Sequence, residues 1–191
     1  MAQTPSTMLS IGTQAPAFSL LEPASGNQVS LADFSDKPLL VVFSCNHCPY
    51  VLHIIESFTE FANQAQHRGL AVVMINSNDV AGYPADSPAK MIELAQRQAF
   101  EFPYLYDESQ QAASAYRAAC TPDFFLFDSS HQLVYRGQYD GSRPGNNVAV
   151  SGSDMRSAVD ALLGGSDIPA DQIPSVGCNI KWRAGNEPDY F

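Results

Sequence analysis

The sequence predicts an α/β fold in which helices flank a central mixed β-sheet. One observation is the continuous apolar run at residues 39–43, which is typical of a strand buried on both faces of a sheet. Another is the order of the patterns along the chain, in which strands and helices alternate before a β-hairpin and a last helix. The length of 191 residues is enough for one ordinary domain with a substantial core.

The N-terminal part of the chain predicts a β-hairpin ahead of this buried strand. Residues 17–21 alternate weakly between apolar and polar side chains, a turn follows at residues 23–27, and residues 28–31 pair back. Residues 1–9 are polar, and we expect them to be frayed.

A long amphipathic helix is predicted directly after the strand, from about residue 46 to residue 67. Its apolar side chains recur at helical spacing, as in Val51, Ile55, Phe58 and Ala62. Gly69 suits the C-terminal end of such a helix. Pro49 must lie in or near the first turn, where a missing N–H group is tolerated.

The rest of the chain continues the sheet and adds a helical insertion in the middle of the domain. Apolar segments predict buried strands at residues 70–76 and 124–128, and residues 133–137 pair back on the second of them through a tight turn. The insertion between the two strands carries two helices and a short strand, at residues 89–99, 109–119 and 103–107. A last helix spans residues 154–163.

These elements group into one domain over residues 9–165, followed by a C-terminal tail. The tail, residues 166–191, is rich in proline and turn-forming residues. We expect it to pack on or near the domain.

Composition and charge narrow the classes of function and the location. The chain carries 20 acidic and 10 basic residues, and such a surface repels phosphate backbones and anionic membranes, so we expect neither nucleic acid nor a membrane as a partner. No apolar run approaches the roughly 20 residues that span a bilayer, and the first residues lack the features of a secretory signal. Four cysteines without such a signal indicate a reducing compartment, and we predict a cytoplasmic protein.

The chemistry of the chain centres on the Cys-x-x-Cys motif formed by Cys45 and Cys48. The motif follows a predicted buried strand and precedes a predicted amphipathic helix, which is the arrangement that makes a reactive dithiol. The partial positive charge of a helix N-terminus favours the thiolate of the first cysteine, and the thiolate is the form that attacks disulfides. The motif therefore predicts a redox protein.

Together with a second motif, this dithiol resembles that of the thioredoxin-like superfamily. The second motif is Cys120-Thr121-Pro122, directly before the strand Asp123-Phe124-Phe125-Leu126-Phe127. The resemblance covers roughly residues 9–165. With its hairpin and insertion, the chain is most similar to the branch that joins the peroxiredoxin-like (AhpC/TSA) and thiol-disulfide oxidoreductase groups. The tail segment Gly177-Cys178-Asn179-Ile180-Lys181-Trp182 resembles that of bacterial thioredoxin-family proteins of unassigned substrate.

The resemblance implies a thioredoxin-like fold with a cis peptide bond between Thr121 and Pro122, opposite the dithiol. The role of this bond would be to hold a loop open beside Cys45 and to present the backbone of Thr121 to an incoming chain. A partner would then bind as an added strand through main-chain hydrogen bonds.

The motif and the resemblance together predict a thiol-disulfide oxidoreductase. Cys45 is the expected nucleophile, and Cys48 resolves the mixed disulfide. In the dipeptide Asn46-His47 between them, His47 is expected to lower the pKa of Cys45 and to make the couple more oxidising than that of ordinary thioredoxin, unless its side chain is simply solvated. The expected partners are a protein or small-molecule disulfide and an upstream reductant, and no organic cofactor is implied.

Two features depart from the thioredoxin pattern. The buried acid expected inside the strand before the dithiol is absent, because residues 39–43 are all apolar, and Glu56 and Asp123 are weak stand-ins for it. Ser44 holds the place where thioredoxin has a tryptophan.

A thiol peroxidase is one alternative reading of the same motif. Peroxiredoxins hold the attacking thiolate with a threonine three residues before it and with an arginine near the cis-proline position. Val42 and the Thr121-Pro122 step stand at those places here. A peroxidase would therefore need Arg117 or Arg143 to reach the thiolate.

A metal-binding module without enzymatic activity is the other alternative. Zinc bound to the dithiol needs two further ligands, which Cys120 and His47 could supply, although we predict no metal site. Cys120 could otherwise be a small buried hydrophobe or join a second disulfide. Cys178 could pair with Cys120 or resolve Cys45, and the spacing alone does not choose between these roles.

Overall fold

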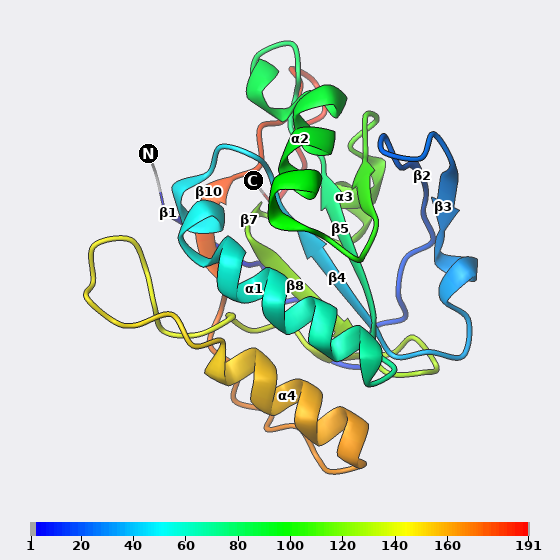
Figure 1. Cartoon of the computed structure of the whole chain (residues 1–191), viewed down its shortest axis with the longest axis vertical. Coiled ribbons are helices and arrows are strands. Elements are labelled where there is room, and N and C mark those ends of the chain that lie inside the picture. Colours follow the sequence, from blue (N-terminus) through cyan, green and yellow to red (C-terminus); the bar gives the residue numbers. More distant parts are fainter. Residues whose placement is uncertain (1–2, 191) are drawn as a thin grey trace.

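A computed structural model of the chain describes residues 3–190 and shows a central mixed sheet of seven strands flanked by helices (Figure 1). The strands are β2 (Ser19–Leu21), β3 (Gln28–Ser30), β4 (Leu39–Phe43), β5 (Ala71–Asn76), β6 (Tyr104–Tyr106), β8 (Asp123–Phe127) and β9 (Leu133–Tyr135). Their order across the sheet is β3-β2-β6-β5-β4-β8-β9. The predicted α/β class and the N-terminal hairpin of β2 and β3 are confirmed.

Strand β4 lies inside the sheet and leads directly to the dithiol. It pairs in parallel with β5 on one side and antiparallel with β8 on the other. All five of its residues are buried, as a strand covered by helices on both faces requires. Because β4 ends at Phe43, the cysteine motif follows at the carboxyl end of a rigid central strand, where α/β proteins commonly place their sites.

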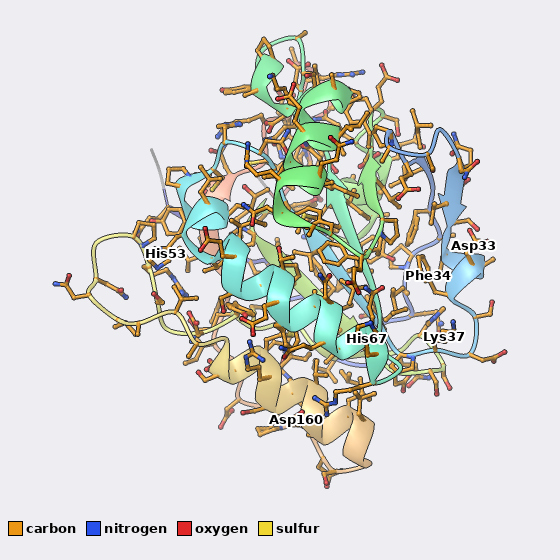
Figure 2. All side chains as sticks on the ribbon, viewed as in Figure 1. Asp33, Phe34, Lys37, His53, His67 and Asp160 are labelled. Carbon is orange, nitrogen blue, oxygen red and sulfur yellow. The ribbon has the colours of Figure 1, made fainter. Side chains whose placement is uncertain are left out.

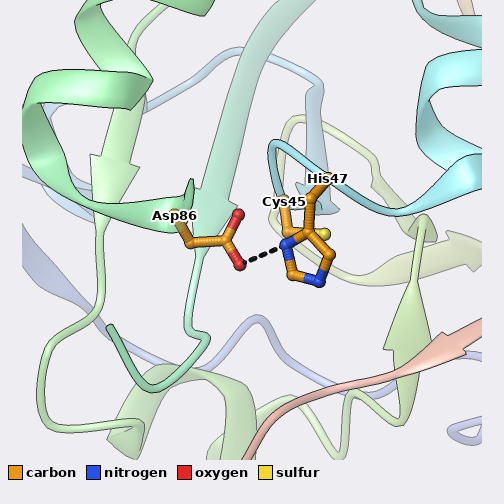
Figure 3. Close-up of side chains that lie close together, drawn as sticks. All are labelled: Cys45, His47 and Asp86. Atoms are coloured by element: carbon orange, nitrogen blue, oxygen red, sulfur yellow. Dashed lines mark ion pairs between the residues drawn. The ribbon is translucent and has the colours of Figure 1, made fainter. Parts of the chain in front are cut away.

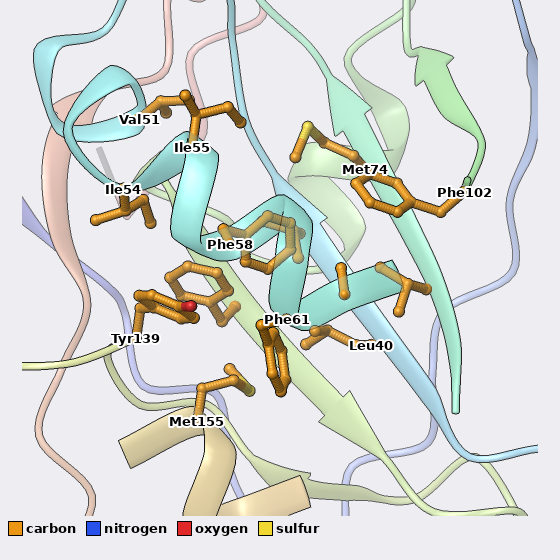
Figure 4. Close-up of a cluster of buried hydrophobic side chains, with 14 of the residues drawn as sticks. Leu40, Val51, Ile54, Ile55, Phe58, Phe61, Met74, Phe102, Tyr139 and Met155 are labelled. Atoms are coloured by element: carbon orange, nitrogen blue, oxygen red, sulfur yellow. The ribbon is translucent and has the colours of Figure 1, made fainter. Parts of the chain in front are cut away.

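Within residues 3–190, four α-helices cover the two faces of the sheet: α1 (Pro49–His67), α2 (Pro88–Gln98), α3 (Gln111–Ala115) and α4 (Ser153–Gly164). Buried side chains of α1, α2 and α4 share one hydrophobic cluster on one face, whereas α3 packs into a second cluster on the other face. Phe58 of α1 lies at the centre of the first cluster (Figure 4), with its ring centroid 5.8 Å from those of Phe124 and Tyr139. These aromatic contacts fix α1 against the sheet and so fix its N-terminus.

Two helices are shorter than predicted. Helix α1 begins at Pro49 instead of residue 46, because the backbone of Cys48 is extended and the N–H group of Asn46 is bound by a side chain of the insertion. Helix α3 ends at Ala115, and the left-handed backbone of Arg117, with φ of 51°, stops any continuation toward residue 119.

The two ends of the chain meet in a second, three-stranded sheet. Strands β1 (Gln3–Pro5), β10 (Val176–Asn179) and β7 (Cys120–Thr121) lie in the order β1-β10-β7, and both pairings are antiparallel. The expectation that the N-terminal residues are frayed is therefore wrong for residues 3–5. The strand pairing also brings the tail against the segment that precedes Pro122.

Helix α1 also contacts the long loop that precedes α4. Figure 2 shows the side chain of His53 extending from α1 toward this loop, where its Nε2 lies 2.7 Å from the Oγ of Ser142. The carboxylate of Asp140 accepts hydrogen bonds from the N–H groups of Ser151 and Gly152, which anchors the end of the loop. Within residues 3–190, no helix combines the length and apolar character that a membrane span requires.

Candidate functional site

The dithiol lies at the junction between β4 and α1. Cys45 is the second residue after β4, and Cys48 is the residue that caps the N-terminus of α1, with Pro49 at the first helical position. Both thiols are free and buried, with exposed fractions of 1% for Cys45 and 0% for Cys48. The predicted pair is thus brought together, in a closed site.

The Thr121–Pro122 segment packs against both thiols. Its peptide bond is cis, as the sequence resemblance implies. The Sγ of Cys45 lies 3.5 Å from the Oγ1 of Thr121, and the Sγ of Cys48, when protonated, donates a hydrogen bond to the Thr121 carbonyl at 3.1 Å. Thr121 therefore contacts one cysteine through its side chain and the other through its backbone.

The carboxylate of Asp86, which the sequence analysis did not predict as a site residue, lies beside the Cys-x-x-Cys motif. Asp86 belongs to the short 3₁₀ turn Pro84–Asp86 in the insertion, and it is completely buried. Its Oδ2 lies 2.8 Å from the Nδ1 of His47 (Figure 3). Its Oδ1 accepts a hydrogen bond from the N–H group of Asn46 at 2.7 Å. One oxygen of Asp86, one ring nitrogen of His47 and the Sγ of Cys45 all lie within 4.8 Å of one another.

Residues of the insertion contact both residues between the two cysteines. The ring of His47 stacks on that of Tyr83, with centroids 5.6 Å apart and planes 5° apart. The Asn46 amide donates to the carbonyl of Ala85 and accepts from the hydroxyl of Tyr104. These contacts fix both side chains of the dipeptide, so the reading of His47 as a freely solvated histidine is wrong: its side chain is 30% exposed and faces Asp86.

The two thiols share a hydrogen bond that moves their pKa values in opposite directions. The pKa of Cys48 is lowered to about 5, first because the Cys45 thiol donates to it and further because Cys178, Thr121 and the N–H of Val51 stabilise its charge. The pKa of Cys45 is raised well above its usual range by the hydrogen bond to Cys48, by burial and by the charge of Asp86. The expectation of a lowered pKa for Cys45 is therefore wrong: the stabilised thiolate is Cys48, which caps the helix.

The two acids suggested from the sequence do not serve the dithiol. Glu56 is exposed on α1. Asp123 is completely buried, but its Oδ2 accepts the N–H group of Ala119, on the side of the sheet away from α1. Burial raises the pKa of Asp123 to about 7. The acid that contacts the motif is Asp86.

The other two cysteines lie on neighbouring strands but on different faces. In the β10–β7 pairing Cys178 stands opposite Thr121, and Asn179 stands opposite Cys120. Since paired residues of neighbouring strands share a face and successive residues alternate, Cys178 shares a face with Thr121 and Cys120 points the other way. Cys178 is near enough to Cys48 for the two thiols to shift each other's pKa, whereas the Cys120 thiol donates to the carbonyl of Pro122 at 3.5 Å.

The zinc set considered from the sequence does not assemble, because Cys120 faces away from the dithiol. A different group, Cys45, His47 and Asp86, offers one thiolate, one imidazole and one carboxylate, all of which zinc accepts. Three protein ligands are the number found in catalytic zinc sites, so the cluster is also a candidate metal site.

The arginines that a peroxidase would need lie elsewhere. The guanidinium of Arg143 donates to the carbonyls of Asp140 and Ser142 and to the side chain of Gln138. Arg117 lies over the ring of Tyr190, 4.5 Å from its centroid. Neither guanidinium hydrogen-bonds a cysteine within the described residues.

Known proteins resemble this chain in sequence and in fold. The AhpC/TSA family model matches residues 11–136. An uncharacterised conserved protein from Geobacillus kaustophilus is 48% identical, with a TM-score of 0.93 over 96% of this chain and 97% of that one. A hypothetical protein from Sinorhizobium meliloti 1021 is 49% identical, with a TM-score of 0.93 over 95% of this chain and 100% of that one. A search of curated proteins gave no match.

More distant solved structures share the fold. A thiol:disulfide interchange protein of the thioredoxin family from Chlorobium tepidum TLS is 21% identical, with a TM-score of 0.63 over 82% of this chain and 99% of that one. A secreted disulfide oxidoreductase from Mycobacterium tuberculosis is 17% identical, with a TM-score of 0.59 over 76% of this chain and 96% of that one. These similarities confirm the predicted thioredoxin-like fold.

Proposed function

The chain belongs to the AhpC/TSA family and has a thioredoxin-like fold, and on that basis we propose that it is a thiol-disulfide oxidoreductase whose dithiol is Cys45 and Cys48. The observation that carries the proposal is the position of the two thiols at the start of α1, where both contact Thr121 and each shifts the pKa of the other. A pair of thiols in contact can exchange one disulfide between them with little movement of the backbone.

The first step is attack by Cys45 on a disulfide, with His47 as its base. A thiol with a raised pKa is a strong nucleophile once its proton is removed. A nitrogen of His47 lies within 4.8 Å of the Cys45 sulfur, a separation that a small rotation or one water molecule closes. His47 takes the proton, the new bond joins Cys45 to one half of the substrate, and the other half leaves as a thiolate that recovers the proton.

The second step uses the thiolate of Cys48. In the reduced protein the pKa of Cys48 is about 5, and after Cys45 has entered the mixed disulfide the contacts with Cys178, Thr121 and the N–H of Val51 still favour the Cys48 thiolate. It attacks the Cys45 sulfur, the Cys45–Cys48 disulfide forms, and the second half of the substrate leaves as a thiolate. Two electrons have then passed from the protein to the substrate, and an upstream dithiol reductant returns them. We propose the cytoplasm, a reducing compartment, as the place where this cycle runs.

A redox titration coupled to peptide mapping tests the proposal. The protein is equilibrated in buffers of defined thiol potential, free thiols are alkylated, and disulfide-linked peptides are identified by mass. We expect a reversible Cys45–Cys48 disulfide that titrates between about −270 and −120 mV. The Cys48→Ser variant should accumulate a mixed disulfide of glutathione on Cys45, whereas the Cys120→Ser variant should behave as wild type.

Two other outcomes would assign another function. Consumption of stoichiometric hydrogen peroxide by the reduced protein, without reaction with glutathione disulfide, would favour a peroxidase. The Cys45, His47 and Asp86 cluster favours a metal-binding module as the second candidate. Tight binding of Zn²⁺ by the reduced protein, lost in His47→Ala and accompanied by unreactive thiols, would support that candidate against the oxidoreductase.

A further inference from the structure

Strand β10 of the tail occupies the backbone edge where a partner strand is expected to bind. It pairs antiparallel with β7, and its residue Cys178 stands directly opposite Thr121. On its other side β10 pairs with β1, so it is the middle strand of its sheet. The chain thus supplies its own added strand at the segment that precedes Pro122.

The fit between β10 and this segment is close. A Cβ atom at Gly177 would lie 2.0 Å from the carbonyl oxygen of Thr121, so no residue but glycine fits there without displacing the strand. The buried hydroxyl of Ser175 donates to the Pro122 carbonyl at 2.6 Å. Gly177 and the hydroxyl of Ser175 therefore allow β10 to pack closely against the Thr121–Pro122 segment.

Strand β10 places a third thiol, that of Cys178, near the dithiol. Cys178 shares a face with Thr121, whose Oγ1 contacts Cys45 and whose carbonyl oxygen lies 3.1 Å from the Cys48 sulfur, and Cys48 and Cys178 are near enough to shift each other's pKa. Burial raises the pKa of Cys178 to about 12, so it rests as a protonated thiol near Cys48. Helix α1 and β10 are in contact, so Cys48 and Cys178 come from elements that already pack together.

We propose that Cys178 is a third redox cysteine, which receives the disulfide from the dithiol and thereby fastens β10 to the start of α1. The proposal rests on the proposed function, since the Cys45–Cys48 disulfide is the oxidant for the step. The Cys178 sulfur attacks Cys48, the Cys45–Cys48 bond breaks, and the Cys48–Cys178 bond forms. Cys45 leaves as a thiolate and takes the proton that Cys178 loses, so the exchange moves a disulfide with no net oxidation.

The exchange would change what the site can accept. Once Cys48 and Cys178 are joined, β10 is held covalently along Thr121, and no incoming chain can pair with that edge. Cys45 is at the same time a free thiol again, beside His47. The oxidised protein would then be closed to extended polypeptides until a reductant opens the Cys48–Cys178 bond.

The test identifies the disulfides that form in the wild-type chain. Fully reduced protein is treated with one equivalent of glutathione disulfide, quenched with acid and an alkylating agent, and digested without reduction. We expect two linked species, Cys45–Cys48 and Cys48–Cys178, with the second absent in Cys178→Ser and retained in the matched control Cys120→Ser. Hydrogen exchange over residues 176–179 should slow in the oxidised wild type and not in oxidised Cys178→Ser.

The possible failures are distinguishable. A wild-type protein that forms Cys45–Cys48 while Cys178 stays fully alkylated would overturn the role of Cys178 and leave the proposed function standing. A protein in which neither Cys45 nor Cys48 is oxidised would overturn both. Because these readings come from the wild-type chain, they do not depend on the folding of any variant.

Discussion

The Nδ1 of His47 lies 2.8 Å from the Oδ2 of Asp86, so a carboxylate from the insertion orients the imidazole between the two cysteines. Asp86 is itself fixed, because its oxygens accept hydrogen bonds from the N–H group of Asn46 and the amide of Asn78. A histidine held in this way presents one ring orientation to Cys45, which is what a base for a high-pKa thiol needs.

Removing this base should slow the attack by Cys45. In a Cys48→Ser background, which traps the mixed disulfide, His47→Ala should reduce the rate of glutathione adduct formation at pH 7 by about 100-fold. Asp86→Asn should reduce it less, since the imidazole remains. Asp79→Asn is the matched control, because Asp79 is in the same loop but faces Arg183 at 3.6 Å.

The Asp86→Asn variant also distinguishes two possible roles of the Asp86 charge, which are to support His47 as a base and to raise the pKa of Cys45. The negative charge of Asp86 is one of the causes that raise the pKa of Cys45, so Asp86→Asn should lower that pKa. If Asp86 acted only by repelling the Cys45 thiolate, Asp86→Asn would react faster than wild type. A faster reaction at pH 7 would therefore contradict the role of the His47–Asp86 pair as a base.

The reduced protein should contain a thiolate far below the pH at which ordinary thiols ionise. The pKa of Cys48 is about 5, so thiolate absorbance near 240 nm should persist at neutral pH and disappear as the pH falls through about 5. Cys48→Ser should abolish this transition. Cys45→Ala removes the first-ranking cause, the hydrogen bond from Cys45, and should move the transition upward.

Cys120→Ser provides the control for this titration, since Cys120 faces the carbonyl of Pro122 and burial raises its pKa. Its titration curve should match that of the wild type. A low-pH transition that survives in Cys48→Ser and vanishes in Cys45→Ala would reassign the resting thiolate to Cys45.

Displacing β10 should both destabilise the protein and expose the dithiol. In Gly177→Ala the new methyl group meets the Thr121 carbonyl, and such overpacking typically costs about 1–3 kcal/mol. Gly164→Ala is the matched control, because Gly164 lies at the end of α4 with open space around its Cβ position. Urea denaturation should show the loss of stability in Gly177→Ala alone.

The same pair of variants tests whether the strand covers the thiols. Cys45 and Cys48 are 1% and 0% exposed, so alkylation of the native protein should be slow. It should accelerate in Gly177→Ala and stay unchanged in Gly164→Ala. Equal alkylation rates in all three proteins would show that reagents reach the dithiol by a path that does not involve β10.

The sequence predicts those parts of the fold and site that neighbouring residues determine. The apolar run of β4, the helical spacing in α1 and the position of Cys45 and Cys48 at their junction are local patterns. The element ends were less accurate, because α1 begins only where the insertion stops binding the backbone of Asn46. Such a boundary depends on a side chain about 40 residues away.

The parts that were missed depend on long-range contacts that leave little local trace. Asp86 lies in a short turn with no periodic pattern, and its function depends on meeting His47 across the fold. Strands β1 and β10 have three and four residues, too few for an alternating pattern to be visible. Their register, with Gln3 opposite Cys178, joins the two ends of the chain and places the third thiol beside Cys48.

The buried acid Asp123 should make folding stability fall as the pH rises. Its pKa is about 7 in the folded protein against about 4 in an unfolded chain, so the folded state binds more protons between these values. The free energy of unfolding should therefore decrease from pH 4 to pH 7, by at most about 4 kcal/mol from this group. Asp123→Asn should remove this slope and keep the acceptor for the N–H group of Ala119.

Asp128→Asn is the control for the Asp123 prediction, because Asp128 lies in the turn after β8 and caps the N–H groups of Ser130 and Gln132. Chemical denaturation of the three proteins at pH 4.5, 5.5, 6.5 and 7.5 gives the three slopes. As the pH rises, we expect the wild type and Asp128→Asn to lose the same amount of stability, and we expect Asp123→Asn to lose less. If the free energy of unfolding of Asp123→Asn instead changes with pH in parallel with that of the other two proteins, then Asp123 is ionised in the folded protein throughout this range. Contacts other than the one with Ala119 then compensate for the burial of its charge.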